Sequence, residues 1–421
     1  MGVAVRRHRP DYQIILYMAL LMLLGLITMY AIGPQRAHIL NLGGGSNISD
    51  SYFFIKQAIA LGLSLVGFAI MAYLPYRWLQ QNALRLLLVG LGLCVVLWLA
   101  HVFHMPFAPS VNGAVRWFNL GPLGSVQPAE FLKFSVVVFV AGLLAARYRE
   151  EKVNDYETTL VPVGALLVLL MVFVVILQKN MSTGIIIALI IMGMLFAAGL
   201  SRKIITLVAI IGLVGGIGLI LIAPHRMARV ATFLQGDSLA SFAAGDDQDL
   251  QARQARIAIG SGGIMGVGIG NSVQATGYLP ESTNDSIFAI MGETFGFVGL
   301  VVILAIFTGL LLRLLRVADH LPQMWMKLAT VGIFAWLVAH VFINVASMVG
   351  VIPLTGVTLP LVSFGGTSMV FIAGALGLVF QLSRYTVNTV NVEGEQYEST
   401  DSGRRLGRTR YARGSSAIGT R

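Results

Sequence analysis

Asp285 is the residue whose type and position best suit chemistry, because it stands where a polar stretch from Asn271 gives way to a long apolar run. A carboxylate at the edge of a helix of hydrocarbon depth is costly to desolvate, so it needs a partner, a water-filled cavity or a chemical role. Held in such a place, it can accept a proton as a general base. A structural alternative stays open, since aspartate just before a helix is also a preferred N-cap.

Glu130 and Lys133 are a second pair of charges at the start of an apolar run. Three residues apart on a helix, they share a face and can form an ion pair. Lys133 could then hold an anion while Glu130 keeps the ammonium group oriented. A purely structural buried pair is the competing interpretation, because charges inside a membrane usually need a partner in any case.

Two pairs of arginines lie three residues apart in a long polar segment: Arg226 with Arg229, and Arg253 with Arg256. Each pair would present its guanidinium groups on one side of a short helix. Such groups suit phosphate oxygens, which they bind through two parallel hydrogen bonds. Contact with anionic lipid headgroups or with nearby aspartates is the alternative. Gln254, in the same stretch, is included with Arg226 and Arg229 among the candidate substrate-binding residues.

A segment at 351–365 interrupts the apolar pattern with two prolines and ends at Gly365 and Gly366. Broken backbone at membrane depth must be buried in protein or line a wet cavity. A new helix beginning near Thr367 would offer free N–H groups to an anion. Ser363 and the two glycines are therefore candidate binding residues, although packing alone could also explain the break.

Composition places these residues in a membrane protein. Hydrophobic residues make up 56% of the chain and charged ones 11%, and the mean hydropathy is +0.80, whereas a soluble domain is about one quarter charged. A window of roughly 20 residues predicts an all-α polytopic membrane protein of about ten transmembrane helices. The expected spans are 12–32, 53–75, 84–105, 129–146, 160–178, 183–200, 203–224, 286–315, 326–350 and 366–385.

The distribution of lysine and arginine predicts the orientation of these spans. Charged connectors follow the fourth, sixth and eighth spans, and an arginine-rich tail follows the last. The positive-inside rule assigns them, with both termini, to the cytoplasm. We expect a cytoplasmic amino terminus (1–11), a membrane domain (12–385) with a large extracytoplasmic loop at 225–284 between helices 7 and 8, and a disordered basic cytoplasmic tail (386–421). No folded basic module accompanies the net charge of +10, so nucleic acid is not an expected partner.

Four stretches resemble the SEDS family (shape, elongation, division and sporulation). They are "NGAVRWFNLGPLGSVQPAEFLK", "RMARVATFL", "SGGIMGVGIGNSVQATGYLPESTNDSIFAIMGETFGFVG" and "IPLTGVTLPLVSFGGTS". Thr358 makes the last one more similar to the division member than to the elongation member. The resemblance implies a peptidoglycan glycosyltransferase of the bacterial cytoplasmic membrane that polymerises lipid II at the outer face. It also implies a class B penicillin-binding protein as partner, with other membrane proteins of the division or elongation complex, and a possible place at the division septum.

The resemblance aligns the family's essential aspartate with Asp285 and its charged pair with Glu130 and Lys133. Its Arg-Trp dipeptide aligns with Arg116 and Trp117. The chain departs from the family in several places. "TNDSIF" replaces the usual "HTDFIF", the usual acid after Glu293 is a threonine, and "QKNMSTG" replaces a stretch like "QPDLGTA".

Joining two lipid-linked sugars requires a base for the attacking hydroxyl and cations for the departing pyrophosphate. We assign the base to Asp285 and the cationic role to Lys133 and the outer arginines. Trp117 would stack on a sugar face or belong to an interfacial belt. No organic cofactor is expected; a Mg²⁺ or Mn²⁺ ion could join the carboxylate and the phosphates.

Two other classes of function remain open. A transporter of the lipid-linked precursor would need charges along a path through the bilayer and paired broken helices. The unusual segments of this chain are all expected on the outer side, which favours an enzyme acting at one face. A scaffold for division partners would leave Asp285 without a purpose.

Overall fold

The long apolar runs fold as helices, because in hydrocarbon each segment must satisfy its own backbone hydrogen bonds. A computed structural model describes residues 8–44, 47–109, 115–119, 121, 124–221, 227, 230, 233 and 247–387. Within them, eight helices are long and apolar enough to cross a membrane. The shorter α7 (Met181–Ala197) and the 20-residue α8 (Arg202–Leu221) occupy the two remaining predicted spans. The predicted class, an all-α polytopic membrane protein, is confirmed.

The other helices are α1 (Tyr12–Gly44), α2 (Tyr52–Tyr73), α3 (Tyr76–Gln81), α4 (Ala83–Val102), α5 (Pro128–Arg149), α6 (Val161–Met171), α10 (Asp247–Ser261), α11 (Ile287–Asp319), α12 (Met324–Val349) and α13 (Gly366–Leu382). Two π-helical turns, η2 (Tyr156–Leu160) and η3 (Val172–Leu177), flank α6, and two 3₁₀ turns are η5 (Gln274–Thr276) and η6 (Ser383–Tyr385). The strands β1 (Phe118–Asn119) and β2 (Ser125–Val126) form an antiparallel hairpin that pairs Phe118 with Val126. This hairpin lies between the expected spans 84–105 and 129–146.

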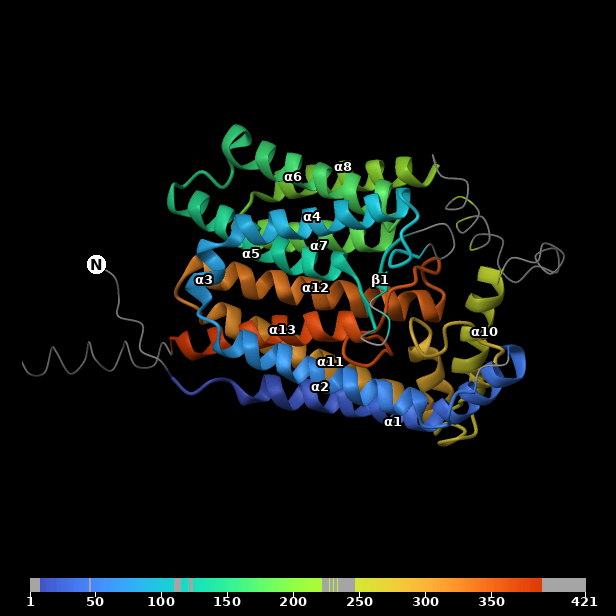
Figure 1. Ribbon diagram of the computed structural model, residues 1–421. Coiled ribbons are helices and arrows are strands. Elements are labelled where there is room, and N and C mark those ends of the chain that lie inside the picture. Colours follow the sequence, from blue (N-terminus) through green and yellow to red (C-terminus); the bar gives the residue numbers. More distant parts are fainter. Residues whose placement is uncertain are drawn as a thin grey trace, which may run out of the picture.

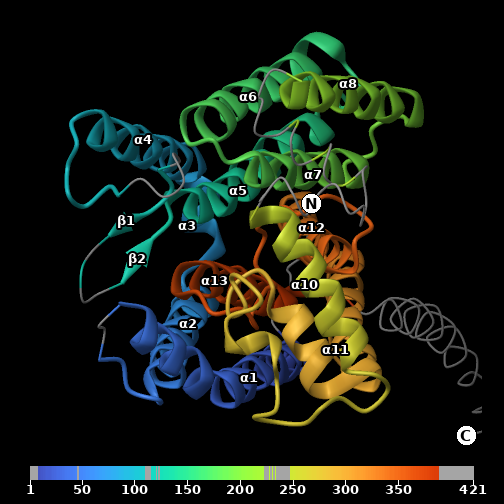
Figure 2. The ribbon, with the colours of Figure 1, turned by 90° about the vertical axis from the view of Figure 1, so that its right-hand side faces the viewer.

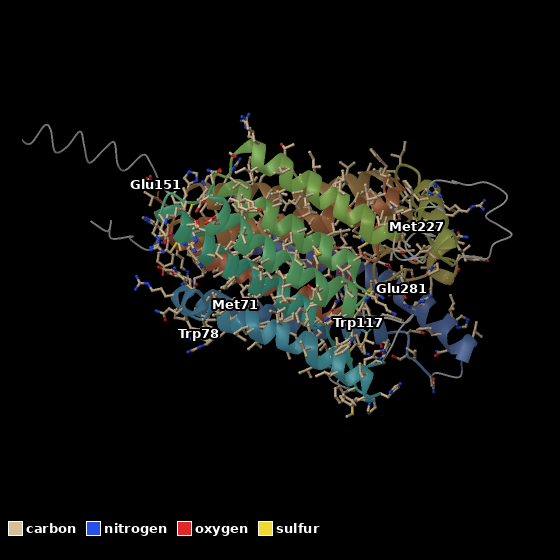
Figure 3. The ribbon with its side chains drawn as sticks, turned by 90° about the horizontal axis from the view of Figure 1, so that it is seen from above. Met71, Trp78, Trp117, Glu151, Met227 and Glu281 are labelled. Carbon is tan, nitrogen blue, oxygen red and sulfur yellow. The ribbon has the colours of Figure 1, made fainter. Side chains whose placement is uncertain are left out.

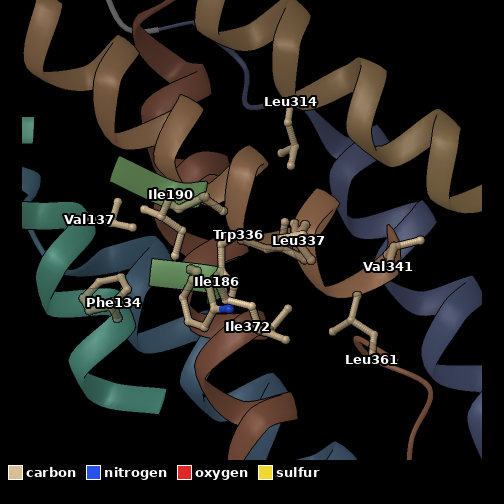
Figure 4. Packing of buried hydrophobic residues seen from close by; sticks show 14 of the residues in the cluster. Phe134, Val137, Ile186, Ile190, Leu314, Trp336, Leu337, Val341, Leu361 and Ile372 are labelled. Carbon is tan, nitrogen blue, oxygen red and sulfur yellow. The ribbon is translucent and has the colours of Figure 1, made fainter. Parts of the chain in front are cut away.

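Helix α12 lies in the middle of the bundle (Figure 1), where it packs against α5, α7 and α11. On one side of it lie α4, α6, α7 and α8, and on the other α1, α2, α11 and α13 (Figure 2). Trp336 of α12 is almost fully buried among Phe134, Ile186 and Ile372 (Figure 4). The helix that crosses the core is therefore also the one best placed to connect polar groups of different helices.

The two ends of the bundle differ in structure. At one end the amino-terminal and carboxy-terminal parts of the described chain meet, since the His8 N–H donates to the carbonyl of Arg384 at 2.8 Å and the Asp11 N–H donates to the hydroxyl of Ser383 at 2.9 Å. At the other end lie α10, the β-hairpin and the segment 351–365 (Figures 1 and 2). Figure 3 shows Glu151 at the first end and Trp117 with Glu281 at the second. Which end faces the cytoplasm stays a prediction.

Two helices differ from their expected spans. Helix α1 was expected to end near residue 32 but continues past Pro34 to Gly44. Beyond the proline, the amide of Gln35 donates to the carbonyl of Gly270 at 2.5 Å. Helix α11 is broken at Gly296, whose φ of 69° and ψ of −169° are not helical. The apolar pattern of the sequence predicts one continuous span here.

The break in α11 is closed by a glycine-rich stretch that follows α10. Phe297 and Val298 donate to the carbonyls of Gly263 and Ile264, at 2.9 and 3.1 Å. A Cβ on Gly266 would come within 2.3 Å of the carbonyl oxygen of Thr294. The glycines of this stretch thus allow close backbone packing, and the packing satisfies the peptide groups that the helix break exposes.

Candidate functional site

Asp285 lies in the turn that leads into α11, and its side chain is 9% exposed. The Nε2 atom of Gln251 on α10 is 3.4 Å from Oδ1 of Asp285 and donates to Oγ of Ser286 at 2.9 Å. The N-cap residue of α11 is Ser286, one position later. Ser286 makes no capping hydrogen bond through its side chain, and Asp285 lies one residue before the cap position, where its carboxylate accepts hydrogen bonds from the local backbone.

The surroundings of Asp285 make it hard to ionise. Burial, and after it the negative charge of Glu281, raise the pKa of its carboxyl from 3.8 to about 7, although hydrogen bonds from the local backbone and from Gln251 oppose the shift. A carboxyl group with a pKa near neutrality is well matched to proton transfer, because it both accepts and releases a proton readily at that pH.

The segment 351–365 lies against the turn that carries Asp285. Phe364 donates its N–H to the carbonyl of Thr283 at 2.9 Å. A Cβ on Gly356, whose φ is +67°, would stand 3.4 Å from Oδ2 of Asp285. The broken backbone that the sequence predicted thus passes directly beside the candidate base, as expected for a segment held inside protein.

Lys133 is the centre of a second polar cluster. Its Nζ atom is 2.8 Å from Oε1 of Glu130, and the side chains are 1% and 5% exposed. The same Nζ is 2.8 Å from Nε2 of His340 and 5.0 Å from the ring centroid of Trp336. The predicted ion pair is present, but the ammonium group is enclosed by three partners and does not face an open surface.

Helix α12 links the two clusters. His340 and Asn344 are one turn apart, about 6 Å along the helix axis. His340 contacts Lys133, whereas the Nδ2 atom of Asn344 donates to the backbone oxygen of Asp285 at 2.7 Å. The structure therefore brings Glu130, Lys133 and Asp285 to the same part of the bundle through residues that were not among the sequence candidates.

Three contact residues were not predicted from the sequence, namely His340, Asn344 and Gln251. A signal existed for the first two, since Trp336, His340 and Asn344 recur every four residues within an apolar run and polar residues inside a membrane segment usually face the bundle interior. Gln251 carried no comparable signal. The candidate from the same helix was Gln254, which is half-buried one turn later.

Ser363, Gly365 and Gly366 lie just before and at the start of α13. The buried hydroxyl of Ser363 accepts the N–H of Leu359 at 2.8 Å, so it holds its own turn together. Gly365 is half-buried and Gly366 is exposed, and a Cβ on either would meet nothing within 4 Å. The hydroxyl of Thr367 donates to the carbonyl of Ser125 at 2.6 Å, which ties this helix start to β2.

The remaining candidates lie at the same end of the bundle or outside the described chain. An Nη2 donor of Arg116 binds the carbonyl of Lys179 at 2.9 Å, and Trp117 is half-buried beside it in sequence. Arg226 and Arg229 lie outside the described residues. The binding roles predicted for all these residues stay predictions.

Glu293 acts as an anchor for the loop before η5. Its carboxylate accepts from the hydroxyl of Ser272 at 2.5 Å and from the N–H groups of Val273 and Gln274 at 2.9 and 3.2 Å. All of these partners belong to the loop, so the second acid of this region holds the backbone around α11 in place.

The fold and the site define a polytopic helical membrane protein with a buried carboxylate and a buried ion pair near one end of the bundle. A family model described as "Cell cycle protein", which unites FtsW, RodA and SpoVE, matches residues 12–388. The chain belongs to this family, which is the SEDS family that the sequence resembles. It is accordingly a multi-pass protein of the bacterial inner membrane.

Two curated relatives illustrate the similarity. Stage V sporulation protein E of Bacillus subtilis is 32% identical over 389 residues, covering 91% of this chain and 100% of that protein. A probable peptidoglycan glycosyltransferase FtsW of the same organism is 30% identical over 388 residues, covering 90% of this chain and 92% of that protein. These identities extend over nearly the whole membrane domain.

Two solved structures share the fold. A chain of a peptidoglycan synthase complex superposes with a TM-score of 0.67 at 24% identity, covering 89% of this chain and 98% of that chain. The rod shape determining protein RodA of Thermus thermophilus gives a TM-score of 0.61 at 24% identity, covering 90% and 98%. Identities at this level support the architecture of the bundle.

Proposed function

We propose that this protein is a peptidoglycan glycosyltransferase that polymerises lipid II at the outer face of the cytoplasmic membrane during cell division. The observation that carries the proposal is the buried carboxylate of Asp285, with a pKa near 7, at the entrance of a membrane helix. Relatives named as probable peptidoglycan glycosyltransferases FtsW support the reaction, and the family description "Cell cycle protein" supports the division role.

In this reaction a hydroxyl oxygen of one sugar forms a bond with the anomeric carbon of the other. The bond from that carbon to the phosphate oxygen breaks, and its electron pair leaves with the lipid pyrophosphate. Asp285 takes the hydroxyl proton. Arg116, Arg226, Arg229 and Gln254 would contact the pyrophosphate, and Trp117 would face a sugar ring.

Lys133 would act on the reacting groups from inside the helix bundle, without direct contact. Because its ammonium group is enclosed by Glu130, His340 and Trp336, it contributes positive charge through the low-dielectric interior and need not contact the phosphates in this arrangement. Ser363, Gly365 and Gly366 would shape the neighbouring surface at the start of α13.

A Mg²⁺ or Mn²⁺ ion would fit this site only with help from the substrate. Among the described residues, no group of three or more histidine, cysteine, aspartate or glutamate side chains could hold a metal ion. Asp285 and Glu281 could supply two carboxylates, and the phosphate oxygens the remaining ligands. Such an ion would neutralise charge on the departing pyrophosphate.

A class B penicillin-binding protein is the proposed partner, which would crosslink the strands that this protein makes, together with other membrane proteins of the division complex. A structural neighbour taken from a peptidoglycan synthase complex supports this proposal. Transport of the precursor is less well supported, because the broken backbone segments of the described chain gather at one end of the bundle.

Purified protein incubated with lipid II, alone and with its cognate transpeptidase, tests the proposed function. We expect glycan strands longer than the starting disaccharide in both mixtures, with more product when the partner is present. A parallel measurement follows lipid II across the bilayer of liposomes that contain the protein. Translocation without any glycan product would reject the enzyme in favour of a transporter.

The proposed orientation places both termini and the connector around Lys152 in the cytoplasm, with Asp246 and Ser363 near the outer side. Single cysteines introduced at these positions into a Cys94→Ser background would report the side on which each lies. We expect a membrane-impermeant thiol reagent added to whole cells with a permeable outer envelope to label position 246 and spare position 152. Labelling in the opposite order would reverse the topology.

A further inference from the structure

Two side chains of α12 bind the backbone of one short segment between α12 and α13. Nδ1 of His340 is 3.3 Å from the carbonyl oxygen of Thr358. Nδ2 of Asn344 donates to the carbonyl oxygen of Val357 at 2.6 Å. His340 and Asn344 are 3% and 0% exposed. Adjacent peptide groups of the segment are thus held from two successive turns of the same helix.

The chemistry of each side chain fixes which of its atoms donate. Nδ1 of His340 faces a carbonyl oxygen and must carry a hydrogen, so in a neutral ring Nε2 is the acceptor for the ammonium group of Lys133. The amide nitrogen of Asn344 has two hydrogens, which go to the carbonyl oxygens of Val357 and Asp285. Each residue therefore joins the segment to one of the two polar clusters.

The segment does not hold this conformation by its own preference. Gly356 and Leu361 have φ angles of 67° and 64°, and a left-handed conformation is costly for leucine. Backbone of this kind persists only where the surrounding structure determines it. Gly356 stands beside the carboxylate of Asp285, so a shift of the segment would change the space around the candidate base.

We propose that His340 and Asn344 form a clamp that fixes Asp285 and Lys133 relative to one another through residues 356–358. Both are positioning residues for the glycosyl transfer, and this role rests on the proposed function. The clamp keeps the proton acceptor, Asp285, and the buried cation, Lys133, in fixed relative positions while the substrate binds.

Hydrogen exchange tests the clamp without any reference to activity. His340→Phe and Asn344→Leu preserve most of the side-chain volume and remove the bonds to the segment. Thr330→Val is the matched control, because Thr330 is fully buried on α12 and its hydroxyl bonds only the carbonyl of Met326 of its own helix. We expect amide hydrogen exchange in peptides covering residues 354–366 to be faster in the first two variants than in the wild type. In the control variant it should be as slow as in the wild type.

Kinetics test the consequence for the reaction. A misplaced reacting group can cost about 100-fold in rate, so we expect kcat to fall by roughly 30- to 100-fold in His340→Phe and Asn344→Leu, and KM to stay within about threefold. In the double variant, the fold-decrease in kcat should be much smaller than the product of the two single fold-decreases, because both substitutions release the same segment. His340→Gln, which keeps one acceptor and one donor, should recover part of the activity.

The outcomes separate the clamp from the proposed function. If the wild-type protein makes no glycan, the proposed function fails, and the exchange measurement still decides whether the segment is clamped. Unchanged exchange over residues 354–366 in both variants overturns the clamp. Losses of kcat that follow the melting temperature, with the control behaving like the two variants, assign His340 and Asn344 to general stability and overturn it as well.

Discussion

Replacing Asp285 with asparagine is expected to lower glycan synthesis by about 100-fold or more while the protein remains folded. Asparagine has nearly the same shape and can still contact Gln251, but it cannot accept the proton of the attacking hydroxyl. The measurement is the initial rate of lipid II polymerisation by purified protein, with the melting temperature recorded in parallel. Polymerisation by the variant at a rate near that of the wild type would remove Asp285 from the role of base.

The pH dependence of the wild-type protein provides a second test of the same assignment. The base must be ionised, so the rate should fall as the pH drops below about 7, the pKa of Asp285. Glu281→Gln removes the neighbouring negative charge that raises this pKa and should move the midpoint to lower pH. A midpoint that does not move in this variant would show that another group controls the profile.

The raised pKa also sets the sign of the effect on stability. The pKa of Asp285 is about 7 in the folded state, against the ordinary value of 3.8. Between these two pH values the carboxyl group is therefore more protonated in the folded state than in the unfolded state. The stability contributed by this group is therefore present at acidic pH and is lost as the pH rises through 7. At pH 8 the Asp285→Asn variant should melt at the same temperature as the wild type or above it.

Lys133→Met is expected to have the second largest effect, on both stability and activity. The substitution leaves the carboxylate of Glu130 buried without its cation, which typically costs about 3–5 kcal/mol. Because the variant also removes the buried positive charge proposed to act in the reaction, glycan synthesis should be lost. Melting temperature and polymerisation rate measured on the same preparation record both effects.

A double variant separates the structural role of the pair from its chemical role. Glu130→Gln with Lys133→Met has no buried charge, so it should recover most of the lost melting temperature. If the lysine acts in the reaction, the activity of this double variant stays low. Polymerisation restored together with stability would instead assign the pair to folding alone.

The sequence predicted those features that depend on local pattern. The membrane spans follow from apolar runs, and the ion pair of Glu130 and Lys133 follows from a spacing of three residues on one helix. Asp285 was expected at the start of a helix and lies one residue before the N-cap of α11.

Features that depend on the pairing of distant segments could not be predicted in the same way. The break at Gly296 is stable because Gly263 and Ile264 accept the hydrogen bonds that the helix loses, and nothing in the local sequence around Gly296 identifies these partners. His340 faces Lys133 across 207 positions of the chain. The choice between Gln251 and Gln254 depends on the rotation of α10 about its axis, which a sequence without periodic apolar residues does not determine.

The break in α11 has a consequence for how the protein is inserted into the membrane. The part of the helix from Phe297 to Asp319 is long enough to cross the hydrocarbon core alone, since about 20 apolar residues suffice. The part Ile287–Phe295 ends at the carbonyls of Glu293 and Thr294, which have partners only once Val267 and Gly268 are folded beside them and donate their N–H groups. We therefore expect insertion of the span to precede packing of Ile287–Phe295, so that the turn with Asp285 reaches its final place only in that later step.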